Sequence, residues 1–125
     1  MRAIKFRGKR ITDGRWVYGG IATSPQKDST TIHTYDDDGY YARGYFVDPA
    51  TIGQFTGLTD KDGKEIYEGD IIRHKDMVKP YHVIYDGHQF TPNDGFRSLS
   101  YPKHWEVMGN IHDNPELLGE KGGEQ

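Results

Sequence analysis

Residues 57–70 read GLTDKDGKEIYEGD, and their acidic and glycine residues recur at the short spacings that turns require. The pair Asp62-Gly63 tolerates the positive φ angles of a tight type I′ hairpin turn. A second turn signal, Glu68-Gly69-Asp70, leads directly into the apolar pair Ile71-Ile72. We therefore interpret the stretch as a hairpin followed by a turn into an apolar strand.

Two ligand-binding interpretations of this stretch are excluded by spacing. A calcium loop of the EF-hand type needs glycine at its sixth position, whereas counting from Asp60 the glycine comes fourth. A phosphate-binding loop needs glycines followed by Lys-Ser or Lys-Thr, and the sequence contains neither pair. The residues predicted to make turns are Gly57, Asp62, Gly63, Gly69 and Asp70.

The rest of the chain has the composition and punctuation of a β protein. Ile, Val, Tyr, Phe, Trp and Thr together number 40, against 8 for Leu and Ala. Short runs of these residues lie between recurring Asp-Gly pairs, at Asp13-Gly14, Asp38-Gly39, Asp62-Gly63, Asp86-Gly87 and Asp94-Gly95. The predicted strands are 3–7, 16–22, 30–35, 40–47, 51–57, 64–67, 70–74, 82–85 and 105–111.

Only one helical signal is present, in residues 114–118. Asn114 can cap, Pro115 suits the first helical position and Gly119 ends the turn, so we predict one short helical turn near the C-terminus. Loops are predicted at 23–29, 75–80, 91–94 and 101–103. The predicted core comprises Phe55, Leu58, Ile66, Ile71, Val83, Trp105, Val107 and Ile111.

Length, charge and cysteine content restrict the class of protein. At 125 residues with a net charge of −3, the chain can bury one core and lacks the self-repulsion of a disordered segment. Without cysteine there is no disulfide framework and no thiolate metal site. The N-terminal basic residues are not followed by an apolar run long enough for a signal peptide, and no stretch is long enough for a membrane span. We expect a cytoplasmic protein without a membrane partner.

Four stretches carry a resemblance to a known family: IKFRGKR (4–10), WVYGG (16–20), TIGQFTGLTDKDGKEIYEGDII (51–72) and VMGNIHDNPELL (107–118). In this order they resemble the YopX family of phage and prophage proteins. The resemblance implies a mainly β protein with one domain over 1–118, in which 1–50 add N-terminal strands and 51–112 form a small SH3-like barrel. Residues 119–125 are expected to be a flexible tail. The resemblance also implies a location in the bacterial host cell, and it carries over no catalytic residue.

The sequence carries no common catalytic or metal-binding pattern. The six histidines are scattered, none forms the helical pair with glutamate of a zinc hydrolase, and there is no nucleophile elbow. His82 and His88 flank the Asp86-Gly87 turn and can meet across a hairpin, with His74 on a preceding strand. A metal site at these three is one interpretation, and ordinary surface histidines are the other. We expect no enzymatic activity and no cofactor.

Residues 1–15 carry six basic side chains against one acidic side chain, Asp13, with Phe6 and Trp16 among them. Such a strip can contact phosphates, so a nucleic-acid-binding small barrel is the alternative function. The overall acidic balance and the run Asp36-Asp37-Asp38 disfavour it, and basic residues on one side of a strand also serve to discourage edge pairing. The candidate contacts are Arg2, Lys5, Arg7, Lys9, Arg10 and Arg15.

Aromatic residues crowd the Gly- and Asp-rich segment 35–46. Aromatic side chains beside polar ones are typical of interface cores, although they can also supply the core of a sheet that has few aliphatic residues. The first interpretation predicts a non-enzymatic accessory module that binds a protein, either an unidentified partner or a second copy, because small β domains gain stability by oligomerising. The candidate interface residues are Tyr35, Tyr40, Tyr41, Tyr45 and Phe46.

Overall fold

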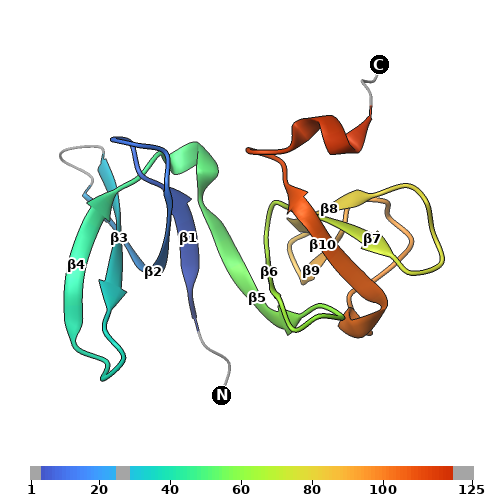
Figure 1. The fold of residues 1–125 in the computed structure, drawn as a ribbon, viewed down its shortest axis with the longest axis horizontal. Coiled ribbons are helices and arrows are strands. Elements are labelled where there is room, and N and C mark those ends of the chain that lie inside the picture. Colours follow the sequence, from blue (N-terminus) through green and yellow to red (C-terminus); the bar gives the residue numbers. More distant parts are fainter. Residues whose placement is uncertain (1–3, 25–28, 120–125) are drawn as a thin grey trace. The chain divides into compact units, whose positions relative to one another are not determined.

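The computed structural model describes residues 4–24 and 29–119, which form ten strands and three one-turn 3₁₀-helices (Figure 1). No α-helix occurs among these residues, so the prediction of a mainly β protein is confirmed. The chain divides into two compact units, unit 1 (Met1–Phe55) and unit 2 (Thr56–Gln125). The strands belong to two antiparallel sheets, ordered β4-β3-β2-β1-β5-β6 and β10-β7-β8-β9.

Unit 1 is built from four strands and the start of a fifth. These elements are β1 (Phe6–Lys9), β2 (Trp16–Ser24), β3 (Ser29–Tyr35), β4 (Tyr41–Phe46), a 3₁₀-helix (Pro49–Thr51) and β5 (Gly53–Thr59), which continues into unit 2. The end of β4 returns to the end of β1, where Arg10 and Val47 form an isolated bridge. Ile32 and Val47 are buried inside this arrangement. A Cβ on Gly8 would lie only 3.1 Å from Val47, so glycine lets the two segments approach.

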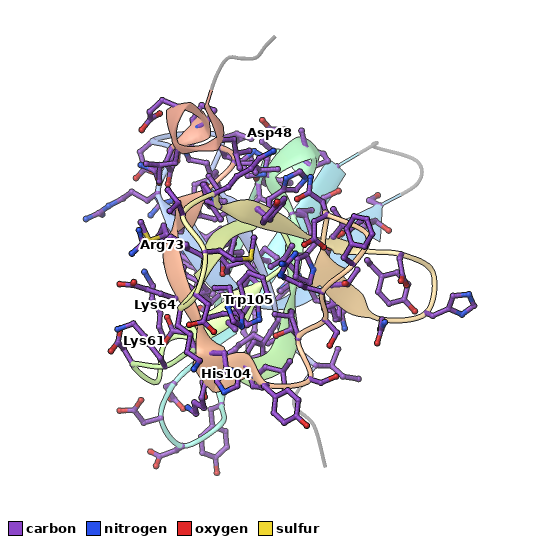
Figure 2. All side chains as sticks on the ribbon, turned by 90° about the vertical axis from the view of Figure 1, so that its right-hand side faces the viewer. Asp48, Lys61, Lys64, Arg73, His104 and Trp105 are labelled. Carbon is purple, nitrogen blue, oxygen red and sulfur yellow. The ribbon has the colours of Figure 1, made fainter. Side chains whose placement is uncertain are left out.

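Unit 2 contains the remaining strands and two further 3₁₀-helices. They are β6 (Glu65–Tyr67), β7 (Asp70–His74), β8 (Tyr81–Tyr85), β9 (Phe90–Pro92), a 3₁₀-helix (Pro102–His104), β10 (Trp105–Asn110) and a 3₁₀-helix (Pro115–Leu118). Its core is a cluster in which each side chain is at most 4% exposed, with Trp105 as the largest member (Figure 2). The cluster comprises Ile66, Ile72, Val83, Leu99 and Trp105.

The predicted core is largely confirmed. Burial is found for Phe55, Ile66, Ile71, Val83 and Trp105. Leu58 and Val107 pack against the cluster as partly buried residues, and Ile111 is half-buried. Five further buried hydrophobic residues among those described were not in the predicted core: Ile32, Val47, Tyr67, Ile72 and Leu99. Leu99 was missed because it lies outside every strand.

Several predicted elements need correction. Thr91 and Pro92 of β9 were predicted as loop, since the strand is short and ends in proline, and two of the three 3₁₀-helices were not predicted. The turn at Pro115–Leu118 is present, but its Asn114 side chain accepts a hydrogen bond from Asn110 N instead of capping it. The predicted SH3-like barrel over 51–112 is not confirmed, because the described strands of that segment are divided between two sheets. Residues 120–125 of the predicted tail lie outside the described residues.

The glycine of each of the five Asp-Gly pairs has a positive φ, between 73° and 101°, as predicted. The loops that hold Gly39 and Gly63 are nevertheless longer than the two-residue type I′ turn. In residues 60–64, Asp60 N donates to Lys64 O and Gly63 N donates to Asp60 O, and residues 36–40 show the same pattern. The reason is the first aspartate of each loop, whose Oδ1 accepts the N–H groups two and four residues later. Gly57 also has a positive φ but lies within β5, so its assignment to a turn was wrong.

Asp60 fastens its loop to the last strand of unit 2. Its side chain is 1% exposed, and Oδ2 accepts a hydrogen bond of 2.9 Å from Val107 N on β10. Lys61 N donates to Trp105 O at 3.0 Å, which adds a second link to the same strand. The Lys61 and Lys64 side chains point away from the strands (Figure 2). Residues 57–70 therefore have a structural role, and a buried carboxylate that accepts hydrogen bonds from three backbone N–H groups holds them in place.

We predict that Asp60→Ala lowers the free energy of unfolding by about 2–4 kcal/mol, because three backbone N–H groups then lose their charged hydrogen-bond acceptor. Asp36→Ala is the matched control, since Asp36 makes the same two loop bonds but is exposed. When both variants are titrated with urea, Asp36→Ala should lose distinctly less free energy of unfolding than Asp60→Ala. Equal losses would show that the bond to Val107 contributes nothing.

The same carboxylate should make stability depend on acid pH. Burial acts to raise the pKa of Asp60, but hydrogen bonds from the backbone N–H groups of Val107, Lys64 and Asp62 outweigh it and bring the pKa below 3.8. A lowered pKa stabilises the fold above about pH 3.8, and this stabilisation is lost as pH falls through the folded-state value. The difference in unfolding free energy between the parent and Asp60→Asn should therefore shrink below pH 4. A difference that stays constant down to pH 2 would contradict this.

Gly63→Ala tests the backbone requirement of the loop separately. Gly63 has a φ of 81° and open space where a Cβ would stand, so any cost comes from the backbone alone. We expect a loss of about 1 kcal/mol in the free energy of unfolding. Gly63→Asn should recover most of it, since asparagine tolerates this conformation better than alanine does. The assignment fails if the alanine variant unfolds at the parent's urea midpoint.

Candidate interaction surface

The predicted basic strip is not a free stripe of charge. Arg7 is only 6% exposed, and its guanidinium lies 4.7 Å from the centre of the Trp16 ring. Lys9 Nζ lies 5.7 Å from the same ring, and Lys5 Nζ lies 5.1 Å from the centre of the Phe55 ring. These cations therefore cover the aromatic side chains of neighbouring strands, an arrangement that stabilises the sheet.

The other members of the strip are dispersed. Arg10 is half-buried, lies 4.6 Å from the centre of the Tyr45 ring and pairs with Asp13 at 3.4 Å. Arg43 lies 4.9 Å from the same Tyr45 ring, so two guanidinium groups contact it. Arg15 is exposed at the Asp13-Gly14 turn, and Arg2 lies outside the described residues. The described residues of the strip therefore offer few exposed charges for a phosphate backbone.

The aromatic residues of segment 35–46 are mostly exposed, so they do not form the core of their own sheet. The exposed fractions are 57% for Tyr35, 73% for Tyr40, 58% for Tyr41 and 57% for Phe46. Tyr45 differs, since it is half-buried and is covered by the arginine side chains described above. Four of the five predicted interface residues are thus accessible.

Strand pairing gathers several of these side chains on one face of the β3–β4 hairpin. The register pairs Thr31 with Phe46, His33 with Gly44 and Tyr35 with Tyr41. The Tyr41 ring lies 5.6 Å from the His33 ring and 6.2 Å from the Tyr35 ring, measured between centres. We call this surface the aromatic face, formed by His33, Tyr35, Tyr41 and Phe46.

Gly44 makes the aromatic face possible at its centre. A Cβ at this position would lie 3.0 Å from the His33 ring and 3.2 Å from the Tyr41 hydroxyl. The missing side chain therefore lets both rings lie over the strand. His33 Nε2 and the Thr31 hydroxyl are 2.9 Å apart, which fixes the imidazole further.

One end of the aromatic face carries negative charge. The loop of residues 36–40, here called the acidic turn, contains three consecutive exposed aspartates and the exposed Tyr40. Asp36 is occupied by the loop's own N–H groups. The Asp37 and Asp38 carboxylates have no cationic partner among the described residues. The tip of the hairpin therefore combines unpaired acidic groups with exposed tyrosine rings.

The three histidines considered for a metal make contacts in different places. His74 packs against the rings of His104 and Trp105, with centres 5.7 Å and 5.1 Å away. His82 is half-buried on β8, where burial lowers the pKa of its imidazole. His88 is exposed at the turn after Asp86, whose Oδ1 accepts the His88 N–H. Within residues 4–24 and 29–119, no group of three or more His, Asp or Glu side chains is arranged to hold a metal ion.

Sequence reasoning missed a pocket in unit 2. It has a volume of about 470 Å³ and is lined by residues of β8, the loop 93–96 and the loop before β8. His82 lies on its wall, and Phe96, which is 90% exposed, lies on its rim. The only signal for the pocket in the sequence is Phe96, an aromatic residue that directly follows the Asp94-Gly95 turn and lies outside every predicted strand.

These observations define a small antiparallel β protein of two units, one of which presents an exposed aromatic hairpin. The family model for the YopX protein matches residues 5–119, so the chain belongs to the YopX family. It is similar to protein EF1440 from Enterococcus faecalis, known from a crystal structure, with 26% identity and a TM-score of 0.57 over 95% of this chain and 100% of that chain. No curated protein matches the chain. In the described part of the chain, no helix has the length and hydropathy needed to cross a bilayer.

Proposed function

We propose that this protein is a non-enzymatic accessory module of phage or prophage type that binds a protein partner through the aromatic face and the acidic turn, in the cytoplasm of the bacterial host. The observation that carries the proposal is the 57–73% exposure of Tyr35, Tyr40, Tyr41 and Phe46. Exposed aromatic clusters are costly in water and are typical of the centres of protein interfaces. Membership of the YopX family supports the phage-type role.

Nucleic-acid binding is the weaker candidate for a physical reason. Phosphate contacts need cations that can leave their present neighbours, and Arg7 is buried over Trp16 while Lys5, Lys9 and Arg10 are half-buried over aromatic rings. The acidic turn adds repulsion. In the proposed function, residues 51–112 form an SH3-like scaffold and contribute no catalytic residue.

Site-specific photo-cross-linking in bacterial cells tests the proposed function. A benzophenone amino acid is placed at Tyr40, and the matched control carries it at Tyr101, since these tyrosines are 73% and 71% exposed. We expect a discrete protein adduct from position 40 and none from position 101, because only the former belongs to the proposed interface.

The size of the adduct then identifies the partner as a second copy or as another protein. A nuclease-sensitive adduct, no adduct, or equal adducts from both positions would contradict the proposed function. Replacing Tyr41 by Ser in the Tyr40 variant should reduce the yield, since the Tyr41 ring contacts His33 and Tyr35 in the aromatic face.

A further inference from the structure

The pocket of unit 2 has the size and lining of a binding site for a side chain. Its volume of about 470 Å³ falls in the usual range for ligand pockets and is ample for one tyrosine ring. Its wall is mixed, with apolar surface beside a cation and hydrogen-bonding groups. The lining residues that matter here are Lys79, Tyr81, His82, Asn93, Phe96 and Leu118.

Two exposed apolar side chains belong to the segments that form this pocket: Phe96 lines it, and Val78 precedes the lining residue Lys79. Phe96 is 90% exposed, and Val78, next to Lys79 in the chain, is also 90% exposed. The side chains of these two residues therefore gain little from the fold of unit 2 itself. An aromatic or aliphatic ligand group that entered the pocket would cover Phe96 and remove it from water.

The charge of the pocket is positive. Lys79 Nζ lies 5.4 Å from the centre of the Tyr81 ring and forms no ion pair among the described residues. Asp94 does not offset it, since its Oδ2 binds Arg97 Nη1 at 3.1 Å and its Oδ1 accepts the N–H groups of Phe96 and Arg97. The pocket therefore favours an aromatic group flanked by carboxylates.

The chain itself contains such a segment in the acidic turn and its neighbours, where Tyr35 and Tyr40 flank Asp36-Asp37-Asp38. Tyr40 is 73% exposed, and the Asp37 and Asp38 carboxylates have no cationic partner among the described residues. Among the described residues, an exposed tyrosine beside two carboxylates without a cationic partner matches a pocket beside a lysine without an ion pair in size, in apolar content and in charge.

We propose that the acidic turn of one copy inserts Tyr40 into the unit 2 pocket of a second copy, with Asp37 and Asp38 near Lys79. This proposal rests on the proposed function for the role of the hairpin and adds the partner and its docking site. Because turn and pocket are different surfaces, the contact is head-to-tail, and repetition closes into a ring or extends into a filament. A hairpin tip buries little surface, so association is weak and is best measured at high protein concentration.

Sedimentation of the parent and two single variants tests the docking. Tyr40→Ser removes the inserted side chain, and Phe96→Ser removes the rim of the pocket. Both residues are exposed, so the fold is retained, and Tyr101→Ser is the matched control. We expect the parent and the control to self-associate and each test variant to associate at least about tenfold more weakly.

Mixing the two variants is the decisive step. The Phe96→Ser copy keeps its acidic turn and the Tyr40→Ser copy keeps its pocket, so an equal mixture should form one-to-one dimers that grow no further. Likewise, Lys79→Glu should lose association and regain it when mixed with an Asp37→Lys, Asp38→Lys variant. A monomeric parent, single variants that still associate, or a mixture that stays monomeric would each overturn the head-to-tail proposal. A photo-cross-link from Tyr40 to a different protein would overturn it while leaving the proposed function intact.

Discussion

The hydrogen bonds that the Asp60 carboxylate accepts are the interaction on which unit 2 depends. One oxygen closes the loop of residues 60–64, and the other accepts the N–H of Val107, so a single buried side chain joins a local turn to a strand 47 residues later. Lys103 Nζ reinforces the junction by donating to Asp60 O and to the Thr59 hydroxyl. The charge of Asp60 is tolerated at 1% exposure because three backbone N–H groups donate the hydrogen bonds that water would otherwise donate. Around this junction the apolar cluster of Trp105, Ile66 and Ile72 can close.

How much of this could be predicted from the sequence depended on the range of each interaction. Positive φ at the Asp-Gly pairs, the inward side of most strands and the turn at Pro115–Leu118 follow from local rules, and local rules succeeded. The role of Asp60 did not follow, because its bond to Val107 needs the strand order, which spacing along the chain does not contain. The barrel prediction failed to be confirmed for a similar reason, since closure is a property of pairing between distant strands.

The candidate binding surfaces also depend on strand pairing, which local sequence rules do not predict. Composition placed a basic strip and an aromatic cluster in unit 1 and left both open as binding sites. The register separates them: Lys9 lies opposite Trp16, and both Lys9 and Arg7 cover the Trp16 ring, whereas the β3–β4 pairing leaves Tyr35 and Tyr41 exposed. The pocket was invisible to sequence reasoning because its lining comes from segments that no single motif connects.

Hydrogen exchange at low and high protein concentration tests the central claim most directly, namely that residues 57–70 are architecture and that the binding surfaces lie elsewhere. The amides of Asp62, Lys64 and Val107 should be protected equally at both concentrations, since they bind Asp60 within one copy. Residues 35–41 and the pocket segments 79–82 and 93–96 should gain protection as concentration rises. Concentration-dependent protection of residues 60–64, or none at the acidic turn and the pocket, would contradict the account.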